Sequence, residues 1–458
     1  MRDRLTNARN RVSSAPSSGG RKPRALSMVF NSVSVMLGKG ATMALGFVFW
    51  LLAARQFAPE EVGLAAGAVS AMMLCTQLAI LGVGSAVIMD FRLHPGGPSR
   101  MLNTSFTVVP AVALTMGAAF LVLASSAFVE LSVLAANPVF AALFLTATVL
   151  GTLGILLDQV SIALRRGDQV FVRGLLFGGG TVAMIVVIPL ATGAENSIAI
   201  FAPWVIAGVG VCLAGLVQLR RSSLRYRFRP RVERSIADRL LRIGLPNWAL
   251  TLTERAPGLI LPIVVTELLS PAANATWYAV WMMAWVVYII PISVGLALFA
   301  EAAHRPETLR AAAMTGIRSA LAIGLTAAVA LALLAHFALS LLGQGYADGG
   351  STPLRILVGA VVPLAFVQAY FAACRARRRL GEAIATGVVS GAIGVGAAAA
   401  AGVAFGLTGM AVAWVVVQAL TGAWAVWRLR SLGGLEGAAS RDAERRAFRS
   451  TTDRPAET

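Results

Sequence analysis

The chain has 458 residues, of which 57% are hydrophobic and only 13% are charged. A soluble domain of this length would carry about a quarter charged residues, so the composition excludes an ordinary soluble protein. Apolar runs of membrane-spanning length recur from end to end and predict a polytopic membrane protein. The three cysteines all fall inside predicted spans, which argues against a disulfide framework or a thiolate metal site.

The apolar runs predict an all-α fold with about twelve transmembrane helices. The predicted spans cover residues 27–54, 62–89, 103–126, 138–164, 172–192, 198–219, 243–267, 274–300, 317–342, 353–374, 383–404 and 407–427. A basic stretch separates the sixth span from the seventh. The chain therefore divides into a basic N-tail (1–26), an N-lobe of six spans (27–219), a basic linker (220–242), a C-lobe of six spans (243–427) and a disordered C-tail (428–458).

The net charge of +18 is explained by membrane orientation. If the N-terminus is cytoplasmic, all but four of the 39 Lys and Arg residues lie on the cytoplasmic side. The four exceptions are Lys39, Arg55, Arg255 and Arg355. This distribution follows the positive-inside rule and predicts that both termini are cytoplasmic, with the basic surplus attracted to anionic membrane lipids. A nucleic-acid partner is therefore not expected.

The two blocks of six spans carry a matching pattern near their beginnings. Asn31 precedes Lys39 by eight residues in the first span, and Asn247 precedes Arg255 by eight residues in the seventh. Because six is an even number, both blocks start on the same side of the membrane. The repeat is then parallel, with a pseudo-twofold axis along the membrane normal.

Lys39 and Arg255 are the deepest cations in the sequence. Lys39 lies about 18 Å along its helix from Ser27, which is too deep for its ammonium group to reach the interface easily. A charge near the bilayer centre costs several kcal/mol and marks a substrate or ion pathway by default. The alternative is a structural ion pair with a buried acid. We expect both cations to line a central cavity, with Asn31 and Asn247 beside them.

Two acidic residues are candidates for ion coupling. Glu254 is adjacent to Arg255, but neighbouring helix residues point about 100° apart and do not pair face to face. Glu254 is therefore either a cation or proton site or a partner for one of the deep cations. Asp158 lies within the fourth span, where pairing with Arg165 or Arg166 is the structural alternative to a coupling role.

Other site chemistry is not indicated. None of the three histidines has a metal-binding constellation around it, and no nucleotide-binding loop is present. No cofactor is expected, and a coupling ion, Na⁺ or H⁺, is left open. The connections on the outer side are too short to form a catalytic domain, so the sequence predicts a transporter rather than an enzyme.

Four segments resemble the polysaccharide flippases of the multidrug/oligosaccharidyl-lipid/polysaccharide exporter superfamily. The first is "FNSVSVMLGKGATMALGFVFWLLAARQFAPEEVGLAAGAVSAMMLCTQLAILGVGSAV", which is similar to the opening pair of spans in that family. The others are "LDQVSIALRRGDQVFVRGLLFGG", "LPNWALTLTERAPGLILPIVV" and "WYAVWMMAWVVYIIPISVGLALFAEAA". Together they cover about two-thirds of the chain. The similarity lies in the pattern of residue types along each segment, and the segments do not contain a strictly defined sequence motif.

The resemblance implies two six-helix lobes that alternate access to a central cavity in a bacterial plasma membrane. It further implies that the substrate is a polyprenyl-diphosphate-linked oligosaccharide, moved to the outer leaflet for cell-surface polysaccharide biosynthesis. Buried cations hold the diphosphate in that family, and Lys39 and Arg255 are the positions that we assign to this role. Polysaccharide polymerase or glycosyltransferase machinery would be the protein partners.

Three other functions stay open. A drug exporter of the same superfamily shares the fold, but acidic residues would suit its cationic substrates better than the deep cations here. A facilitator of the major facilitator type also has six plus six spans, yet "DFRLHPGGPSR" after the second span does not fit its usual turn. A membrane-bound glycosyltransferase or polymerase would need sizeable outer loops, which this chain lacks.

Overall fold

The computed structural model describes residues 24–91, 97–222, 226–304 and 309–452, and these residues form helices without any β-strand. The helices are α1 (Arg24–Gln56), α2 (Pro59–Ala79), α3 (Val83–Asp90), α4 (Pro98–Ala127), α5 (Val133–Ala136), α6 (Pro138–Ala163), α7 (Gly167–Thr192), α8 (Ser197–Arg220), α9 (Arg234–Leu268), α10 (Pro271–His304), α11 (Leu309–Ser340), α12 (Gln344–Val358), α13 (Val361–Ala376) and α14 (Leu380–Thr452).

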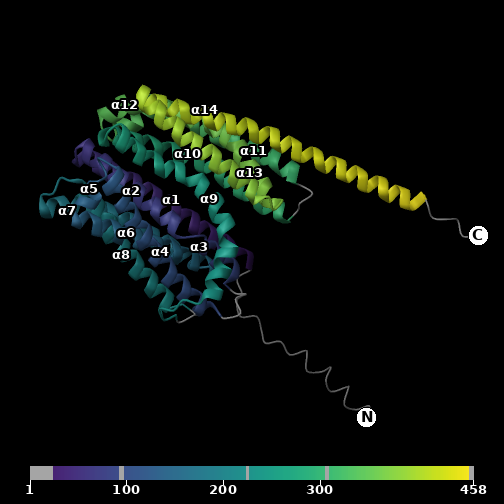
Figure 1. Cartoon of the computed structure of the whole chain (residues 1–458), viewed down its shortest axis with the longest axis horizontal. Helices are drawn as coiled ribbons and strands as arrows, with labels where there is room; N and C mark the ends of the chain where they lie inside the picture. The colour runs from purple at the N-terminus through teal and green to yellow at the C-terminus, as the bar shows by residue number, and fades with distance from the viewer. Residues whose placement is uncertain (1–23, 92–96, 223–225, 305–308, 453–458) are drawn as a thin grey trace, which may run out of the picture.

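The helices form two bundles in chain order (Figure 1). Helices α1 to α8 pack mainly on one another, with α1 lying along α7, and helices α9 to α14 pack in the same way, with α9 lying along α14. The bundles meet where α2 packs on α9 and α10. The two-lobe architecture predicted from the sequence is confirmed, and the pairing of α1 with α7 and of α9 with α14 follows the proposed repeat.

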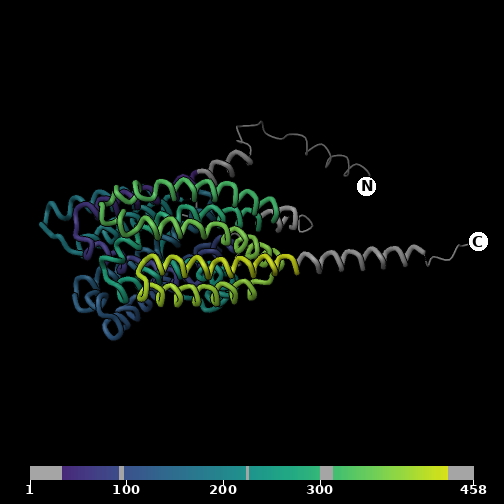
Figure 2. Tube along the Cα trace, turned by 90° about the horizontal axis from the view of Figure 1, so that it is seen from above, coloured from purple at the N-terminus to yellow at the C-terminus, as the bar shows by residue number. Residues whose placement is uncertain are grey.

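The described helices provide twelve candidate crossings when the bent pair α12–α13 and both halves of α14 are counted. Ten described helices are long and apolar enough to span a membrane, or eleven if the bent pair α12 and α13 counts as one span. α14 is counted once, although its backbone is non-helical at Gly406. Figure 2 shows the chain turning back on itself in this region. The two halves of α14 correspond to the eleventh and twelfth predicted spans.

Two predicted spans are broken. The second divides into α2 and α3, where Leu81 and Gly82 both have positive φ angles, of 44° and 74°. Gly82 lies against Gly244 of α9, and a Cβ atom on either glycine would fall within 2.4 Å of the other's carbonyl oxygen. The helix is therefore interrupted where the backbone of α9 passes. The tenth span is bent by 43° between α12 and α13.

Two helices extend beyond the predicted segment boundaries. The linker was expected to extend to residue 242, but α9 already begins at Arg234. The tail from residue 428 was expected to be disordered, but α14 continues as a helix to Thr452. This tail is rich in Ala, Arg and Glu, which are good helix formers, and no proline interrupts it before residue 455. The predicted N-tail is described only from residue 24, where α1 begins.

We call the end of the molecule at which α1 begins the inner end, and the opposite end the outer end. Side chains of α1 and α9 tie the lobes together at the outer end. Arg55 of α1 donates hydrogen bonds to the carbonyl oxygens of Ser340 and Leu341. Glu267 of α9 accepts hydrogen bonds from three successive backbone N–H groups, at residues 129–131.

Gly63 lies at the tightest point between the lobes. The Asn274 amide of α10 donates a 2.8 Å hydrogen bond to the Gly63 carbonyl oxygen of α2. A Cβ atom at Gly63 would lie 1.6 Å from the carbonyl oxygen of Pro271, so no other residue fits without moving a helix. Such close approach through small residues is how helices associate in lipid, where no hydrophobic force drives them together.

We expect Gly63→Ala to lower the thermal unfolding midpoint of the detergent-solubilised protein, because the added methyl group forces α2 away from α10. Overpacking of this kind costs about 1–3 kcal/mol. Gly210→Ala is the matched control, since a Cβ atom at Gly210 meets no atom within 4 Å. Equal unfolding midpoints for the two variants would contradict the close packing of α2 against α10 at Gly63.

Candidate functional site

Lys39 lies on α1 with an exposed side chain. The residue before it, Gly38, packs against the backbone of Phe171 on α7, and Gly174 packs on the same part of α1. These glycines let the two helices approach closely and hold the Lys39 backbone against α7. Within the described residues, Lys39 forms no ion pair or hydrogen bond, but its charge acts on the carboxylate of Asp158.

Asp158 forms an ion pair with Arg173 of α7. Its Oδ1 atom accepts hydrogen bonds from Nε and Nη2 of Arg173 at 3.0 and 2.7 Å. The Arg173 side chain is 2% exposed and also donates to the Leu157 carbonyl oxygen, to Ser161 Oγ and to Gln218 Oε1. Every donor group of this guanidinium is thus directed at a partner, as a buried charge requires.

The structural alternative for Asp158, pairing with a nearby arginine, is met by Arg173 and not by Arg165 or Arg166, which the sequence offered as examples. Arg166 pairs with Asp168, and Arg165 lies in the turn with a φ of 59°. Both arginines belong to the turn that joins α6 to α7. Arg173, by contrast, lies almost two turns into α7, at a level from which it reaches back to Asp158 on α6. We had counted Arg173 among the charges that orient the chain in the membrane.

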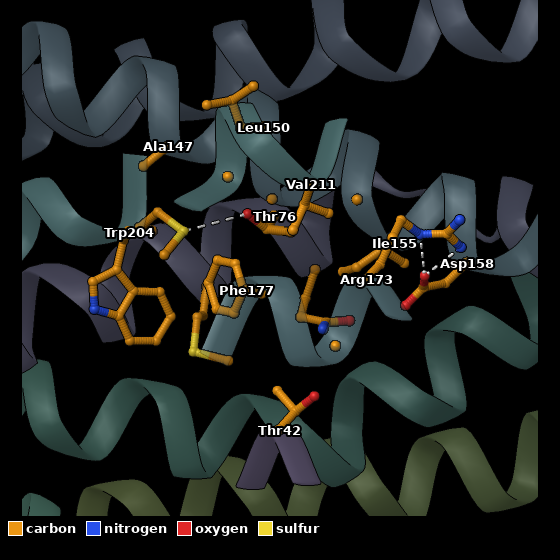
Figure 3. Close-up of a pocket in the computed structure, with 17 residues that line it drawn as sticks. Thr42, Thr76, Ala147, Leu150, Ile155, Asp158, Arg173, Phe177, Trp204 and Val211 are labelled. Carbon is orange, nitrogen blue, oxygen red and sulfur yellow. Dashed lines mark hydrogen bonds and ion pairs between the residues drawn. The ribbon is translucent and has the colours of Figure 1, made fainter. Parts of the chain in front are cut away.

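A cavity of about 240 Å³ lies inside the N-lobe, between α1, α2, α6, α7 and α8 (Figure 3). Asp158 and Arg173 lie at one end of it and Trp204 at the other, with Phe177 between them. Methionine, leucine, isoleucine, valine and glycine residues form most of the wall. The cavity is therefore largely apolar with a charged pair at one end.

Arg255 of α9 is exposed and, in the part of the chain that the structure describes, forms no ion pair or hydrogen bond. Its neighbour Glu254 instead pairs with Arg375 of α13, with 3.4 Å between Nη2 and Oε2. Both of these side chains are nearly buried, at 11% and 8% exposed. Glu254 is therefore a partner of neither deep cation, and Arg375 was overlooked because it begins a cluster of arginines at the inner end.

Glu254 lines a second, smaller cavity of about 60 Å³ inside the C-lobe. Its Oε1 atom is buried and has no hydrogen-bond partner. Gln368 and Gln418, both buried, line the same space together with several aromatic rings. One carboxylate oxygen is thus neutralised by Arg375, and the other is left free beside two amides.

The structure does not bring the six predicted site residues together. Lys39 and Arg255 line neither of the two cavities, and each lobe holds an acid–arginine pair besides its deep cation. Asn247 is half-buried, and its backbone carbonyl accepts a hydrogen bond from Thr251. The Asn31 side chain lies outside the part that the structure describes.

The two lobes share one electrostatic arrangement. Each contains an acid neutralised by a nearly buried arginine and an unpaired cation on its first helix. No group of three or more His, Cys, Asp or Glu residues that could hold a metal occurs among the described residues. The charge left over at the two first helices is therefore positive, and it suits an anionic ligand.

Comparison with protein-family models and with curated protein sequences finds no match. Solved structures do match. An inward-facing multidrug resistance MATE family transporter of the MOP superfamily is 16% identical, with a TM-score of 0.65 over 87% of this chain and 99% of that chain. The lipid II flippase MurJ in an inward closed conformation is 11% identical, with a TM-score of 0.67 over 88% of this chain and 87% of that chain.

A further match is a MOP superfamily transporter from Pyrococcus furiosus, described as having a binding pocket of reverse polarity. It is 15% identical, with a TM-score of 0.60 over 89% of this chain and 96% of that chain. These likenesses show that the chain has the two-lobe fold of MOP superfamily transporters. They extend over nearly the full length of both chains, so both lobes take part.

We expect Arg173→Ala to destabilise the protein by about 1–3 kcal/mol, because it removes the hydrogen bonds to the Leu157 carbonyl oxygen and Ser161 and leaves the partly exposed Asp158 without its partner. Arg166→Ala is the matched control. Its pair with Asp168 is about half exposed, and exposed pairs contribute about 0–1 kcal/mol. Unfolding by denaturant in detergent would measure both. Similar stabilities of the two variants would contradict a structural role for Arg173.

Proposed function

We propose that this chain is a membrane transporter of the MOP superfamily that flips polyprenyl-diphosphate-linked oligosaccharide between leaflets by alternating access. The observation that carries the proposal is the pair of exposed, unpaired cations, Lys39 and Arg255, one on the first helix of each lobe. A likeness in fold to a lipid II flippase supports it.

The charge balance of the two lobes supports a diphosphate. Arg173 neutralises Asp158, and Arg375 neutralises Glu254, so neither acid cancels the charge of Lys39 or Arg255. A diphosphate that links a lipid to a sugar carries two negative charges. Two cations placed on different lobes could bind one phosphate group each, and such charge-assisted bonds are strong where water is scarce.

The position of the cations also suits a substrate that crosses the bilayer. Lys39 and Arg255 belong to different lobes, so a ligand that binds both links the lobes through its charged group. The lipid tail would remain in hydrocarbon between the lobes, because burying it in protein offers no gain over lipid.

We further propose a bacterial plasma membrane location with both termini in the cytoplasm, on the basis of the positive-inside pattern. In that orientation the inner end faces the cytoplasm, where lipid-linked sugars would enter. Polymerase or glycosyltransferase machinery would then act before and after the flipping step.

Glu254 is the stronger of the two candidates for ion coupling. Its Oε1 atom is buried without a hydrogen-bond partner, whereas Asp158 is 40% exposed and bound twice by Arg173. A buried carboxylate oxygen without a partner is costly, and binding of H⁺ or Na⁺ would relieve the cost. Coupling at Glu254 would place the driving ion one residue from Arg255.

We expect Lys39→Ala and Arg255→Ala each to reduce flipping of a fluorescent polyprenyl-diphosphate sugar in liposomes by at least tenfold, because each removes charge-assisted hydrogen bonds worth about 1.5–3 kcal/mol. Lys39→Arg should retain most activity. Arg355→Ala is the control for loss of a cation elsewhere, since Arg355 bonds only to the Ala332 carbonyl oxygen among the described partners. Native rates in both alanine variants would refute the assignment.

We expect an imposed H⁺ or Na⁺ gradient to change the native flipping rate, and Glu254→Gln to abolish this response while flipping without a gradient persists. Glutamine keeps the hydrogen-bonding shape but cannot bind either ion through a charge. Asp158→Asn serves as the comparison. A response lost in Asp158→Asn and kept in Glu254→Gln would transfer the coupling role to Asp158.

A second candidate function is export of small amphiphilic compounds. Two observations favour it: the likeness in fold to multidrug transporters, and a largely apolar cavity in the N-lobe that could enclose a small molecule. The deep cations argue against cationic drugs. Export of a dye from loaded vesicles, in the absence of lipid-linked sugar flipping, would select this function.

A further inference from the structure

The N-lobe cavity has no part in binding the diphosphate as proposed above. Neither Lys39 nor Arg255 lines it, and its volume of about 240 Å³ is enough for a single ring-sized group. Its walls come from five helices of one lobe, so the space is built by the lobe itself and does not depend on how the two lobes meet.

Three polar groups in the cavity wall have no partner among the described residues. The side-chain amide of Gln77 forms no hydrogen bond, although its backbone carbonyl oxygen accepts one from Trp248. Asp158 uses only Oδ1 in its pair with Arg173, which leaves Oδ2 free. The indole N–H of Trp204 is buried without an acceptor. The Trp204 N–H is buried, whereas Gln77 and Asp158 are partly exposed, so a ligand in the cavity would bond to groups that are otherwise left to water.

The remaining wall is apolar and partly aromatic. Phe177 and Trp204 present rings, and Met72 and Leu150 add flexible and branched apolar surface. A few polar groups set in an apolar, aromatic wall are typical of pockets that orient a small ligand. A sugar ring has this dual character, since its C–H faces are apolar and its hydroxyl groups donate and accept at the rim.

The cavity lies next to the proposed diphosphate site. Thr42 of α1 lines it, only three residues from Lys39, and Gly174 of α7 packs between Thr42 and the Gly38 carbonyl oxygen. Asp158, at the charged end of the cavity, is within reach of the Lys39 charge. A group attached directly to a phosphate at Lys39 would therefore lie beside the part of the cavity wall that Thr42 forms.

We infer that the N-lobe cavity binds the sugar unit that is attached directly to the diphosphate, with Asp158 Oδ2 and the Gln77 amide at its hydroxyl groups and Phe177 and Trp204 against its ring. This inference rests on the proposed function. It makes the cavity the place where the transporter distinguishes one lipid-linked glycan from another, while Lys39 and Arg255 recognise the part that all of them share.

Gly154→Leu is the sharpest test. Gly154 lines the cavity, and a Cβ atom there meets no atom within 4 Å, so a leucine side chain would start in open space and reduce the volume of the cavity. Gly210→Leu is the matched control, because Gly210 on α8 is exposed, lies outside the cavity and is equally free of neighbours. Gln77→Ala is a second variant, which removes a hydrogen-bonding group without filling the cavity.

Each variant would be reconstituted in liposomes and given two fluorescent substrates, a polyprenyl diphosphate bearing one sugar and the same lipid diphosphate without a sugar. We expect Gly154→Leu to slow flipping of the glycosylated lipid by at least tenfold and Gln77→Ala by about fivefold, in line with loss of one buried hydrogen bond. Both should flip the sugar-free lipid at the native rate, and Gly210→Leu should flip both lipids normally.

Native flipping of the glycosylated lipid by Gly154→Leu would overturn the inference and leave the proposed function standing. Equal loss of both substrates would also overturn it, since the cavity would then not be specific for sugar. If Gly154→Leu blocks only export of a small amphiphilic dye, the cavity is a small-molecule site and the inference is wrong. If the native protein flips neither lipid, the proposed function itself fails.

Discussion

The cost of placing charge inside a membrane governs this structure. Each lobe contains an acid that would be prohibitive alone, and each acid is held by a nearly buried arginine: Asp158 by Arg173 and Glu254 by Arg375. Because these pairs cancel, the charge that remains at the first helices is that of Lys39 and Arg255. The selectivity for an anion that we propose depends on this cancellation. Removing Arg173 or Arg375 would therefore change the charge balance of the site even though Lys39 and Arg255 remain in place.

The contacts within the lobes differ in kind from the ties between them. Within the lobes, glycines such as Gly38 and Gly174 allow α1 and α7 to pack backbone against backbone, which makes each lobe a firm unit. Between the lobes, the ties at the outer end run from side chains to backbone groups, as with Arg55 and Glu267. Water could replace bonds of this kind at far lower cost than repacking a core.

Much of the fold could be predicted from hydropathy and charge, because spans and loops differ so strongly in composition. Lys39 and Arg255 were found because a lone cation in apolar sequence stands out. Arg173 and Arg375 were missed because they lie near basic turns and were counted with the charges that set orientation, although they bind acids on neighbouring helices. The break at Gly82 depends on the distant Gly244, and the N-lobe cavity depends on five helices. Neither the break nor the cavity produces a pattern in the neighbouring sequence from which it could be predicted.

The contact between Gly82 and Gly244 has a mechanical consequence. It joins the two lobes through bare backbone, at a point where the chain of the N-lobe leaves the helical path. Side-chain bonds flank this crossing on α9, since Arg239 pairs with the buried Asp90 of α3 and Trp248 donates to the Gln77 carbonyl oxygen of α2. Because the backbones touch and both flanks are bonded across the seam, a side chain at either glycine would force the two lobes apart and strain these bonds.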